Sequence, residues 1–231
     1  MRITAFVLFM SFSFSFGQKS YEFDTLLEYE CRFNTSKSDT LVTQYIYTNS
    51  KDNSYYITVR GHDKLNYSLE FADIDNYHSV VKVLRSQLFN FNLISIDNCK
   101  NVHKMTNRYK SKIRNYAFTI QSDTIISSKT YKSYTLKYLK SKRKKKKNKI
   151  GTNHYIIKNN TEYHLPILTH PLTYNEWKKE NNIPNGIYKE YFFYNHNDKI
   201  TNHHKLKKIK QVAVKLNLVK PCPLIITVPT N

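Results

Sequence analysis

Two pairs of carboxylates have the spacing that acid–base chemistry would need. Glu22 with Asp24, and Asp73 with Asp75, are each two residues apart, so both members of a pair share one face of a strand. General acid–base catalysis also requires a substrate cleft beside the carboxylates, and neither pair adjoins a motif that forms one. We therefore expect solvated surface carboxylates rather than catalytic ones.

Enzyme motifs are absent from the rest of the sequence. It contains no nucleophile elbow, zinc-protease helix, phosphate-binding loop or dinucleotide-binding glycine motif. A hydrolase would need a catalytic constellation, and the sequence does not contain one. We therefore predict a non-enzymatic protein that has no catalytic residues and no cofactor.

The nine histidines do not form a metal-binding pattern. His203 and His204 are adjacent, so on a strand their side chains point to opposite faces and cannot easily share one ion. His164 and His170 flank a loop that contains Pro166. No two cysteines have the close spacing of zinc ligands. We expect surface or loop histidines and no metal site.

The sequence has three cysteines, and their settings differ. Cys31 shares one face of an alternating segment with Leu27 and Tyr29, which predicts a buried and inert thiol. Cys99 in DNCKN and Cys222 in KPCPL lie in loop-like segments. An oxidising compartment permits one disulfide, and we favour Cys99 with Cys222 for it.

Residues 140–149, KSKRKKKKNK, contain eight Lys or Arg in ten positions. The run lies between TYKSYTLKYL, which has the pattern of a strand, and NHYIIKNNTEYHLPIL, which indicates a strand, an Asn-Asn turn and a strand. We predict a solvated hairpin loop at 140–150 that repulsion between like charges extends. In the alternative interpretation the run contacts an anionic surface. The contacting residues would be Lys142, Arg143, Lys144, Lys145, Lys146, Lys147 and Lys149.

The N-terminus has the three-part pattern of a secretory signal peptide. Arg2 is followed by an apolar run at residues 3–16, and the small residues Ser15 and Gly17 suit a cleavage position after Gly17. The run is too short for a membrane-spanning helix, which needs about 20 residues. We predict a signal peptide at 1–17 and an exported protein that is periplasmic, outer-membrane associated or secreted. Export argues against a nuclear address and against nucleic acid as a partner.

Residues 18–231 suit a single domain with one sizeable core. The whole chain has 37 Lys and Arg against 17 Asp and Glu, a formal net charge of +20. The basic character extends beyond the run, with six basic residues in 100–114 and five Lys with two His in 199–210. A field of this sign attracts anionic surfaces. For an exported protein these are lipid headgroups, lipopolysaccharide or acidic glycans.

Apolar and polar residues alternate with a period of two, as in antiparallel strands with one wet face. The 19 Tyr and 13 Phe fit strands better than helices. GHDK at 61–64 is typical of a hairpin loop, and NHND at 195–198 is typical of a turn. The alternating segments are 55–60, 65–71, 116–120, 134–138, 163–167 and 212–218.

One helix is predicted at 174–182. Thr173 and Glu176 have the spacing of a capping box, and a Pro and a Gly follow the segment as stop signals. Residues 77–90 have a pattern that suits a second short helix or a strand equally well. The polar and basic segment 98–114 is predicted to be a long loop.

Several segments together resemble a type of protein exported by Gram-negative bacteria. These are FDTLLEYE as a first strand, YIYTNSKDNSYYITV as a hairpin, and GTNHYIIKNNTEYHLPIL, which covers about 150–167 and ends near Pro166. The pattern is similar to that of LolA-like lipoprotein carriers and related β-rich exported families. The resemblance implies a curved antiparallel sheet, an open half-barrel with one or two short helices, whose apolar concavity holds acyl chains in that family. No functional residue is carried over.

Two functions from different classes remain open. The first is an exported non-enzymatic protein that binds an apolar or amphipathic ligand within the curved sheet. The alternative is a surface adhesin or scaffold that contacts anionic lipid or glycan through a basic face. The first requires a pocket of a few hundred Å³, and the second requires salt-dependent binding to anionic surfaces. The oligomeric state is not fixed by the sequence.

Overall fold

The computed structural model of the protein describes residues 19–34, 39–88, 92–96, 101–107 and 109–218. The predicted signal peptide at 1–17 lies outside the described residues, and so do Cys99 and Cys222 with their predicted disulfide. Among the described residues, no helix is both long enough and apolar enough to cross a membrane.

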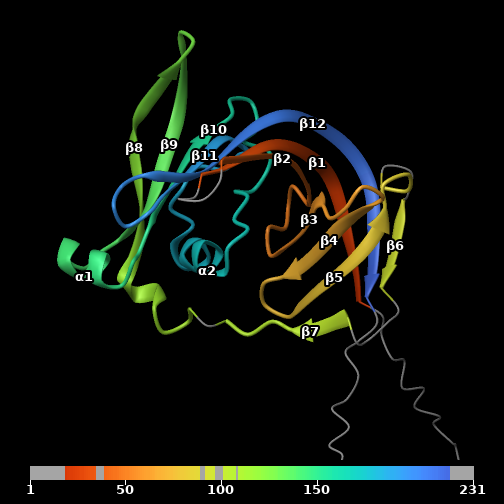
Figure 1. The fold of residues 1–231 in the computed structure, drawn as a ribbon. Coiled ribbons are helices and arrows are strands. Elements are labelled where there is room, and N and C mark those ends of the chain that lie inside the picture. The colour runs from red at the N-terminus through yellow and green to blue at the C-terminus, as the bar shows by residue number, and fades with distance from the viewer. Residues whose placement is uncertain (1–18, 35–38, 89–91, 97–100, 108, 219–231) are drawn as a thin grey trace, which may run out of the picture.

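The fold is one open sheet of 12 strands, mainly antiparallel as predicted, with the strand order β7-β5-β4-β3-β2-β1-β12-β11-β10-β9-β8 (Figure 1). β6 lies off this path and pairs with β12 in parallel. The strands are β1 (Lys19–Asn34), β2 (Asp39–Thr48), β3 (Tyr55–Gly61), β4 (Asn66–Asp73), β5 (Tyr77–Leu84), β6 (Leu93–Ile96), β7 (Val102–Lys104), β8 (Tyr116–Ile126), β9 (Lys129–Tyr138), β10 (Thr152–Ile157), β11 (Tyr188–Tyr194) and β12 (Ile200–Leu218). The helices are η2 (Ile113–Asn115), α1 (Lys142–Lys147) and α2 (Pro171–Glu180).

The two longest strands, β1 and β12, pair along most of their lengths and arch over the rest of the molecule (Figure 1). Irregularities in their register fall between Phe23 and Thr25 and between Glu28 and Tyr29, and such bulges increase the local twist and bend. The arch joins two halves, because β2–β5 follow β1 on one side and β8–β11 follow β12 on the other. The buried hydrophobic residues form two clusters, one of which includes residues from both halves.

The first core, here called the meander core, packs the start of β1, the end of β12 and β6 against strands β2–β5. The Tyr21 ring lies 4.7 Å from the Phe71 ring, between centroids. Strands β3 and β4 contribute alternate residues to it, including Ile57, Val59 and Leu69, all fully buried. This packing explains why alternation at 55–60 and 65–71 predicted the strands correctly.

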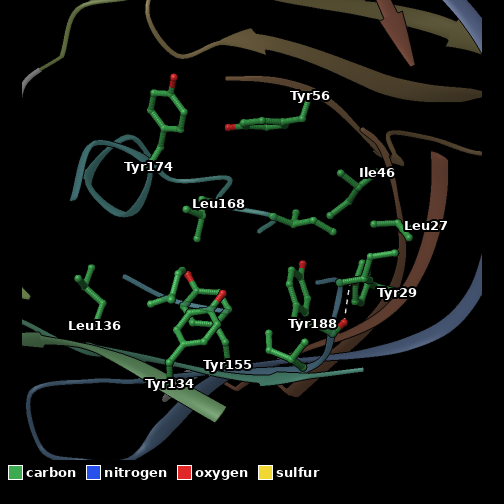
Figure 2. Packing of buried hydrophobic residues seen from close by; sticks show 14 of the residues in the cluster. Leu27, Tyr29, Ile46, Tyr56, Tyr134, Leu136, Tyr155, Leu168, Tyr174 and Tyr188 are labelled. Carbon is green, nitrogen blue, oxygen red and sulfur yellow. Dashed lines mark hydrogen bonds between the residues drawn. The ribbon is translucent and has the colours of Figure 1, made fainter. Parts of the chain in front are cut away.

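The second core, here called the concave core, fills the inner face of the arch (Figure 2). Tyr29 stacks on Tyr188 at 4.5 Å between centroids, and its hydroxyl donates to the Tyr188 carbonyl at 2.9 Å. Leu168, from the segment before α2, and Tyr174, from α2 itself, pack into the same cluster. The concavity that the family resemblance implied is therefore occupied by the protein's own side chains.

Residues 163–167 are not a strand, which corrects the prediction from their alternation. The backbone at 165–169 is irregular because it hydrogen-bonds to three separate residues rather than to a neighbouring strand. The Leu165 amide donates to the Ser50 carbonyl, Asn53 Nδ2 donates to the Pro166 carbonyl, and the Tyr56 hydroxyl donates to the Thr169 carbonyl. Its apolar residues Ile167 and Leu168 are buried, so its alternation reflects burial without strand pairing.

Helix α2 exists, but it begins three residues earlier than predicted and uses a different cap. The N-cap is His170, whose Nδ1 accepts from the Leu172 amide, and Pro171 occupies the first turn. Thr173 donates its hydroxyl to the His170 carbonyl instead of capping. Asn181 ends the helix with a φ of 49°, a conformation that asparagine tolerates.

The remaining predictions of local structure are mostly confirmed. Residues 62–65 connect β3 to β4, and 195–198 connect β11 to β12, where Asp198 has a φ of 58°. Residues 77–84 form strand β5 and not a helix. Within the described part of 98–114, β7 and η2 interrupt the predicted loop.

Candidate functional site

An open cleft of about 890 Å³ lies at the end of the concave face, beyond the filled core. Its walls come from one end of each of the five strands β8–β12, from η2, from the residues after α1 and from the start of α2. The lining residues are Tyr109, Lys112, Asn115, Tyr116, Tyr138, Asn148, Lys149, Ile150, Gly151, Asn153, His170, Leu172, Tyr191, Phe193 and Asn202. The lining is thus aromatic and amide-rich with two lysines.

The aromatic wall continues the side-chain rows of the concave core. Tyr116 and Tyr138 are paired across β8 and β9, with ring centroids 5.3 Å apart. Asn153, Phe193 and Asn202 form a row across β10, β11 and β12. Rings beside amides in one row give a surface that can both stack on a planar or apolar group and hydrogen-bond to a polar one.

Two contacts fix the geometry of this wall. The Tyr191 hydroxyl donates to Asn153 Oδ1 at 2.8 Å, which orients both side chains. Gly151 allows Phe193 to lie directly over the β10 backbone. A Cβ at this position would collide with the Phe193 ring and would lie 2.5 Å from the Tyr194 carbonyl oxygen. The glycine is therefore needed for the close approach of the two strands here.

The basic run forms one rim of the cleft. It lies between β9 and β10, which pair with each other, so it joins the two strands of a hairpin. It is not an extended loop, however, because Lys142–Lys147 form the short helix α1. Ser141 caps it by accepting from the Lys144 amide, and Lys145 Nζ pairs with Asp198 Oδ1 at 2.9 Å. Lysine is a good helix former, so a cap and one tether suffice despite the repulsion.

Residues after α1 bring the run to the cleft itself. Asn148, Lys149 and Ile150 line it, and Lys149 has a φ of 51°. The other predicted contact residues of the run lie on α1 and outside the lining. Lys145 lowers the pKa of Asp198 by donating a hydrogen bond to that carboxylate and by its positive charge. Of the predicted contact residues of the run, Lys149 therefore lines the cleft, and the others lie on α1.

Two long segments of the chain that contribute to this cleft have basic residues and no acidic ones. Residues 98–122 and 124–161 contain 18 Lys and Arg and no Asp or Glu, whereas the whole chain carries a net +20. These residues include β8, β9, α1, β10 and the lining residues Lys112 and Lys149. Lys112 and Lys149 thus line the cleft within segments that have no acidic residue, and such an arrangement favours an anion there.

The side chains that line the cleft are suited to binding a ligand more than to catalysis. Its described lining has no Asp, Glu or Cys. In the part of the chain that the structure describes, no group of three or more His, Cys, Asp or Glu side chains is placed to hold a metal ion. The arrangement can stack on a ring or an alkyl chain, hydrogen-bond through amides, and attract an anion.

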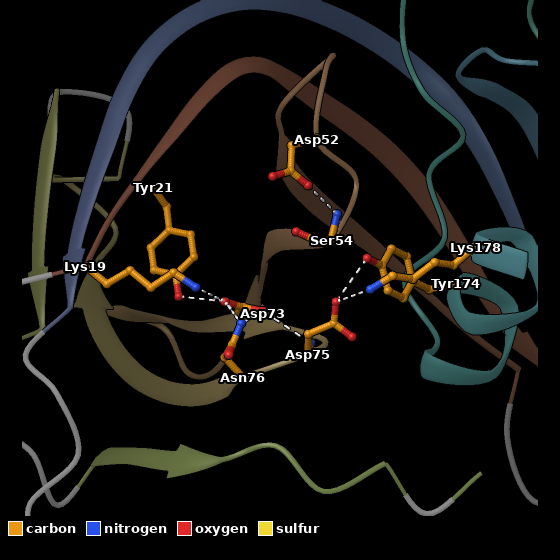
Figure 3. Close-up of polar contacts among 9 residues, drawn as sticks. All are labelled: Lys19, Tyr21, Asp52, Ser54, Asp73, Asp75, Asn76, Tyr174 and Lys178. Atoms are coloured by element: carbon orange, nitrogen blue, oxygen red, sulfur yellow. Dashed lines mark hydrogen bonds and ion pairs between the residues drawn. The ribbon is translucent and has the colours of Figure 1, made fainter. Parts of the chain in front are cut away.

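The predicted carboxylate pairs lie elsewhere, and both members of the pair Asp73 and Asp75 are structural anchors (Figure 3). Asp73, only 2% exposed, accepts from Lys19 Nζ at 2.8 Å, from the Tyr21 hydroxyl at 2.7 Å and from the Asn76 amide. Asp75 pairs with Lys178 at 2.7 Å. These contacts tie the β4–β5 turn to β1 and α2, so Asp73 is not the solvated group that we expected.

Asp24 is also an anchor. It accepts from the Ser50 amide at 3.0 Å and from the Ser50 hydroxyl at 2.6 Å. Burial opposes its ionisation, but the hydrogen bonds from Ser50 and Thr25 lower the pKa of Asp24 below its usual value. Its neighbour Glu22 is exposed and pairs with Lys215, as a surface carboxylate would.

The histidines and Cys31 occupy structural positions. His203 stacks on Phe192 on one face of the sheet, while His204 contacts Tyr191 on the other, as their adjacency predicts. His164 lies in the irregular segment before α2, where it is buried and its Nε2 lies 2.9 Å from the Thr48 hydroxyl. Cys31 is buried, and burial raises the pKa of its thiol to about 12, so it is inert as predicted.

Sequence reasoning missed the cleft, although two signals were present. Tyr191 and Phe193 are two residues apart in YKEYFFY, which is an alternating aromatic segment that was not assigned to a strand. The segments 98–122 and 124–161 have no acidic residue, which also indicated that charge is unevenly distributed along the chain. The local sequence does not show that residues from 109 to 202 meet at one place.

No protein-family model and no curated protein matches the chain. Among solved structures, it is similar to a "putative outer membrane lipoprotein-sorting protein domain" from Vibrio parahaemolyticus, with a TM-score of 0.34 and 10% identity over 81% of this chain and 85% of that one. It is also similar to a DUF1329 family protein from Desulfovibrio piger, with a TM-score of 0.34 and 7% identity over the same shares. The first is the type of protein that the sequence resembles. Similarities at this level support no statement about function.

Proposed function

We propose that this protein is an exported, non-enzymatic binding protein whose cleft holds an amphipathic ligand with an acidic group. The observation that carries the proposal is a cleft of about 890 Å³ whose lining combines aromatic rings, amides and two lysines. Ligand pockets commonly have about 300–1,000 Å³ and a few placed polar groups. Export rests on the N-terminal sequence pattern, and the periplasm, outer membrane and exterior remain the compartments that it fits.

An amphipathic ligand fits better than a purely apolar one. The deep part of the concave face is filled by the protein's own residues, such as Leu168 and Tyr188, so a buried acyl-chain tunnel has no room there. The open part of the cleft has amides and lysines among its rings. An apolar ligand would leave those polar groups without partners, at a cost in binding free energy. An amphipathic ligand satisfies both kinds of lining.

An acidic group on the ligand follows from the charges around the cleft. Lys112 and Lys149 lie on the lining, and the segments 98–122 and 124–161 to which they belong have no acidic residue. A charge-assisted hydrogen bond from lysine to a phosphate or carboxylate is about twice as strong as a neutral one. The described lining lacks the paired acid and base that hydrolysis would require, which supports a binding role.

Isothermal titration calorimetry tests the proposal with monomeric amphiphiles below their aggregation concentration. We expect lauroyl lysophosphatidylglycerol, an anion, to bind more tightly than the zwitterionic lauroyl lysophosphatidylcholine. Lys149→Gln and Tyr138→Ala should each weaken binding of the anion roughly tenfold, about 1.4 kcal/mol. Lys64→Gln and Tyr163→Ala alter exposed residues outside the lining and serve as matched controls. Equal affinity for the two amphiphiles, or equal loss in the controls, contradicts the proposal.

A further inference from the structure

Helix α1 presents a compact basic surface beside the mouth of the cleft. Its exposed residues, with the two exposed apolar residues next to it, are here called the docking surface. The docking surface consists of Leu139, Lys142, Arg143, Lys144, Lys146, Lys147 and Ile200. We propose that it docks the protein on an anionic lipid bilayer, with the mouth of the cleft next to the bilayer surface.

The folded state of the run favours a binding surface over a solvated loop. Ser141 caps α1 and the Lys145–Asp198 ion pair ties it to the β11–β12 turn, so the charges are held in one place. Lys145 is the one α1 residue with an ion pair in the described part of the chain. Like charges three and four residues apart repel one another. A bound anionic surface would relieve that repulsion.

The apolar residues favour a bilayer over a soluble polyanion. Leu139, directly before α1, is 59% exposed, and its amide bonds to the Asn115 carbonyl, so its position is fixed. Ile200, two residues after the Asp198 that pairs with Lys145, is 43% exposed. A soluble acidic polymer would leave both side chains in water. The bilayer interface accepts apolar side chains and attracts lysines at the same time.

The residues that follow α1 place this helix next to the cleft. Asn148, Lys149 and Ile150 follow α1 immediately and line the cleft. A bilayer that contacts α1 therefore lies beside the opening, where an amphipathic lipid could pass between the two. This last step rests on the proposed function of the cleft, whereas docking itself does not.

Co-sedimentation with vesicles of phosphatidylglycerol and phosphatidylcholine tests the docking. The variant carries Lys142→Gln, Lys144→Gln, Lys146→Gln and Lys147→Gln. It keeps the helix-forming tendency and the Lys145–Asp198 tether. Each lysine should contribute about fivefold, so the partition coefficient should fall by roughly two to three orders of magnitude.

The matched control removes the same charge from other exposed positions. It carries Lys64→Gln, Lys82→Gln, Lys208→Gln and Lys210→Gln, and we expect it to keep most of the vesicle binding. Equal losses in the two variants would show a general effect of net charge and would overturn the proposal. Binding of heparin, a soluble polyanion, that matches vesicle binding in strength would overturn the choice of a bilayer.

Fluorescence quenching by brominated lipids tests the orientation. Leu139→Trp places an indole in the docking surface, and Leu65→Trp places one on the β3–β4 loop, where Leu65 is 72% exposed. We expect strong quenching of the first and little of the second, each compared with the native Trp177 signal. Quenching at residue 65 alone would overturn the orientation. The quadruple α1 variant should still bind monomeric lysophosphatidylglycerol, so failure of docking and failure of the cleft proposal are distinguishable.

Discussion

His204, on β12 beside the concave core, is half-buried, and its two ring nitrogens are buried without a hydrogen-bond partner among the described residues. Its ring lies among those of Tyr29, Phe33 and Tyr191. Burial, with smaller effects from Arg60 and His203, lowers its pKa from 6.5 to about 4. The unfolded chain therefore binds a proton at a higher pH than the folded protein does. The free energy of unfolding therefore has its full value above pH 6.5. It falls by at most about 3 kcal/mol as the pH decreases toward 4.

His204→Phe should flatten this pH dependence. The replacement keeps an aromatic ring in the site and removes two unpaired polar atoms, so stability at neutral pH should be equal or higher. The free energy of unfolding, measured by urea denaturation at several pH values between about 7 and 4.5, should fall less steeply than in the wild type. Some slope should remain, because burial also lowers the pKa of His154 and His164. The exposed position His103, changed to Phe, controls for added hydrophobicity. A slope unchanged in His204→Phe would contradict this account.

Asp73 is the residue whose loss should cost most among the carboxylates. Asp73→Ala would leave the Tyr21 hydroxyl without its acceptor and Lys19 without its ion pair. Removing one partner from a buried charged network typically costs about 3 kcal/mol. We expect a loss of that size in the free energy of unfolding by urea. The exposed Asp123→Ala is the control, and a loss below about 1 kcal/mol at Asp73 would show that the network is not structural.

At the scale of elements, strands were predictable where their alternation matched a buried face. Segments 55–60 and 212–218 lie against the meander core, and their pattern gave the correct structure. Segment 163–167 has the same alternation but no strand partner, and Pro166 has no amide hydrogen to give to one. The α2 cap was missed because His170 uses its ring nitrogen where a Thr or Ser oxygen is the usual acceptor.

The like charges on helix α1 lead to a prediction about stability that does not depend on the docking proposal. The four substitutions Lys142→Gln, Lys144→Gln, Lys146→Gln and Lys147→Gln remove repulsion and bury nothing, since these residues are exposed. The melting temperature should therefore stay equal or rise by a few degrees. Lys145→Gln, which breaks the pair with Asp198, should lower it slightly. A quadruple variant that melts many degrees lower would mean that α1 packs against the fold more tightly than its exposure indicates.

At the scale of the whole molecule, the fold class was predictable and the cleft was not. Period-two alternation and the aromatic content indicated one antiparallel sheet. The cleft, by contrast, joins Tyr109, Lys149 and Asn202, and their proximity depends on how β1 and β12 arch and on which strands follow them. The absence of acidic residues from 98–122 and 124–161 could have been noted from the sequence alone.

The exposed basic residues of α1 predict a steep salt dependence of binding to anionic vesicles. Mobile ions screen exposed charges within about 10 Å at 0.1 M salt and about 3 Å at 1 M. Vesicle co-sedimentation should therefore fall strongly when the salt rises from about 50 to about 500 mM, while a residual fraction due to Leu139 and Ile200 remains. Binding that is constant over this range would show that electrostatic attraction does not bring the protein to the membrane.

The central claim is that the aromatic cleft binds an amphipathic anion, and amide chemical-shift mapping by NMR tests it most directly. During titration with monomeric lauroyl lysophosphatidylglycerol, the amide signals of Asn115, Gly151 and Asn202 should move in a saturable manner, because these residues line the cleft. The signals of Ser68 and Glu70 on β4, in the other half of the sheet, should stay in place. Shifts confined to β4 and its neighbours, or no saturable shift at the three cleft residues, would contradict the claim.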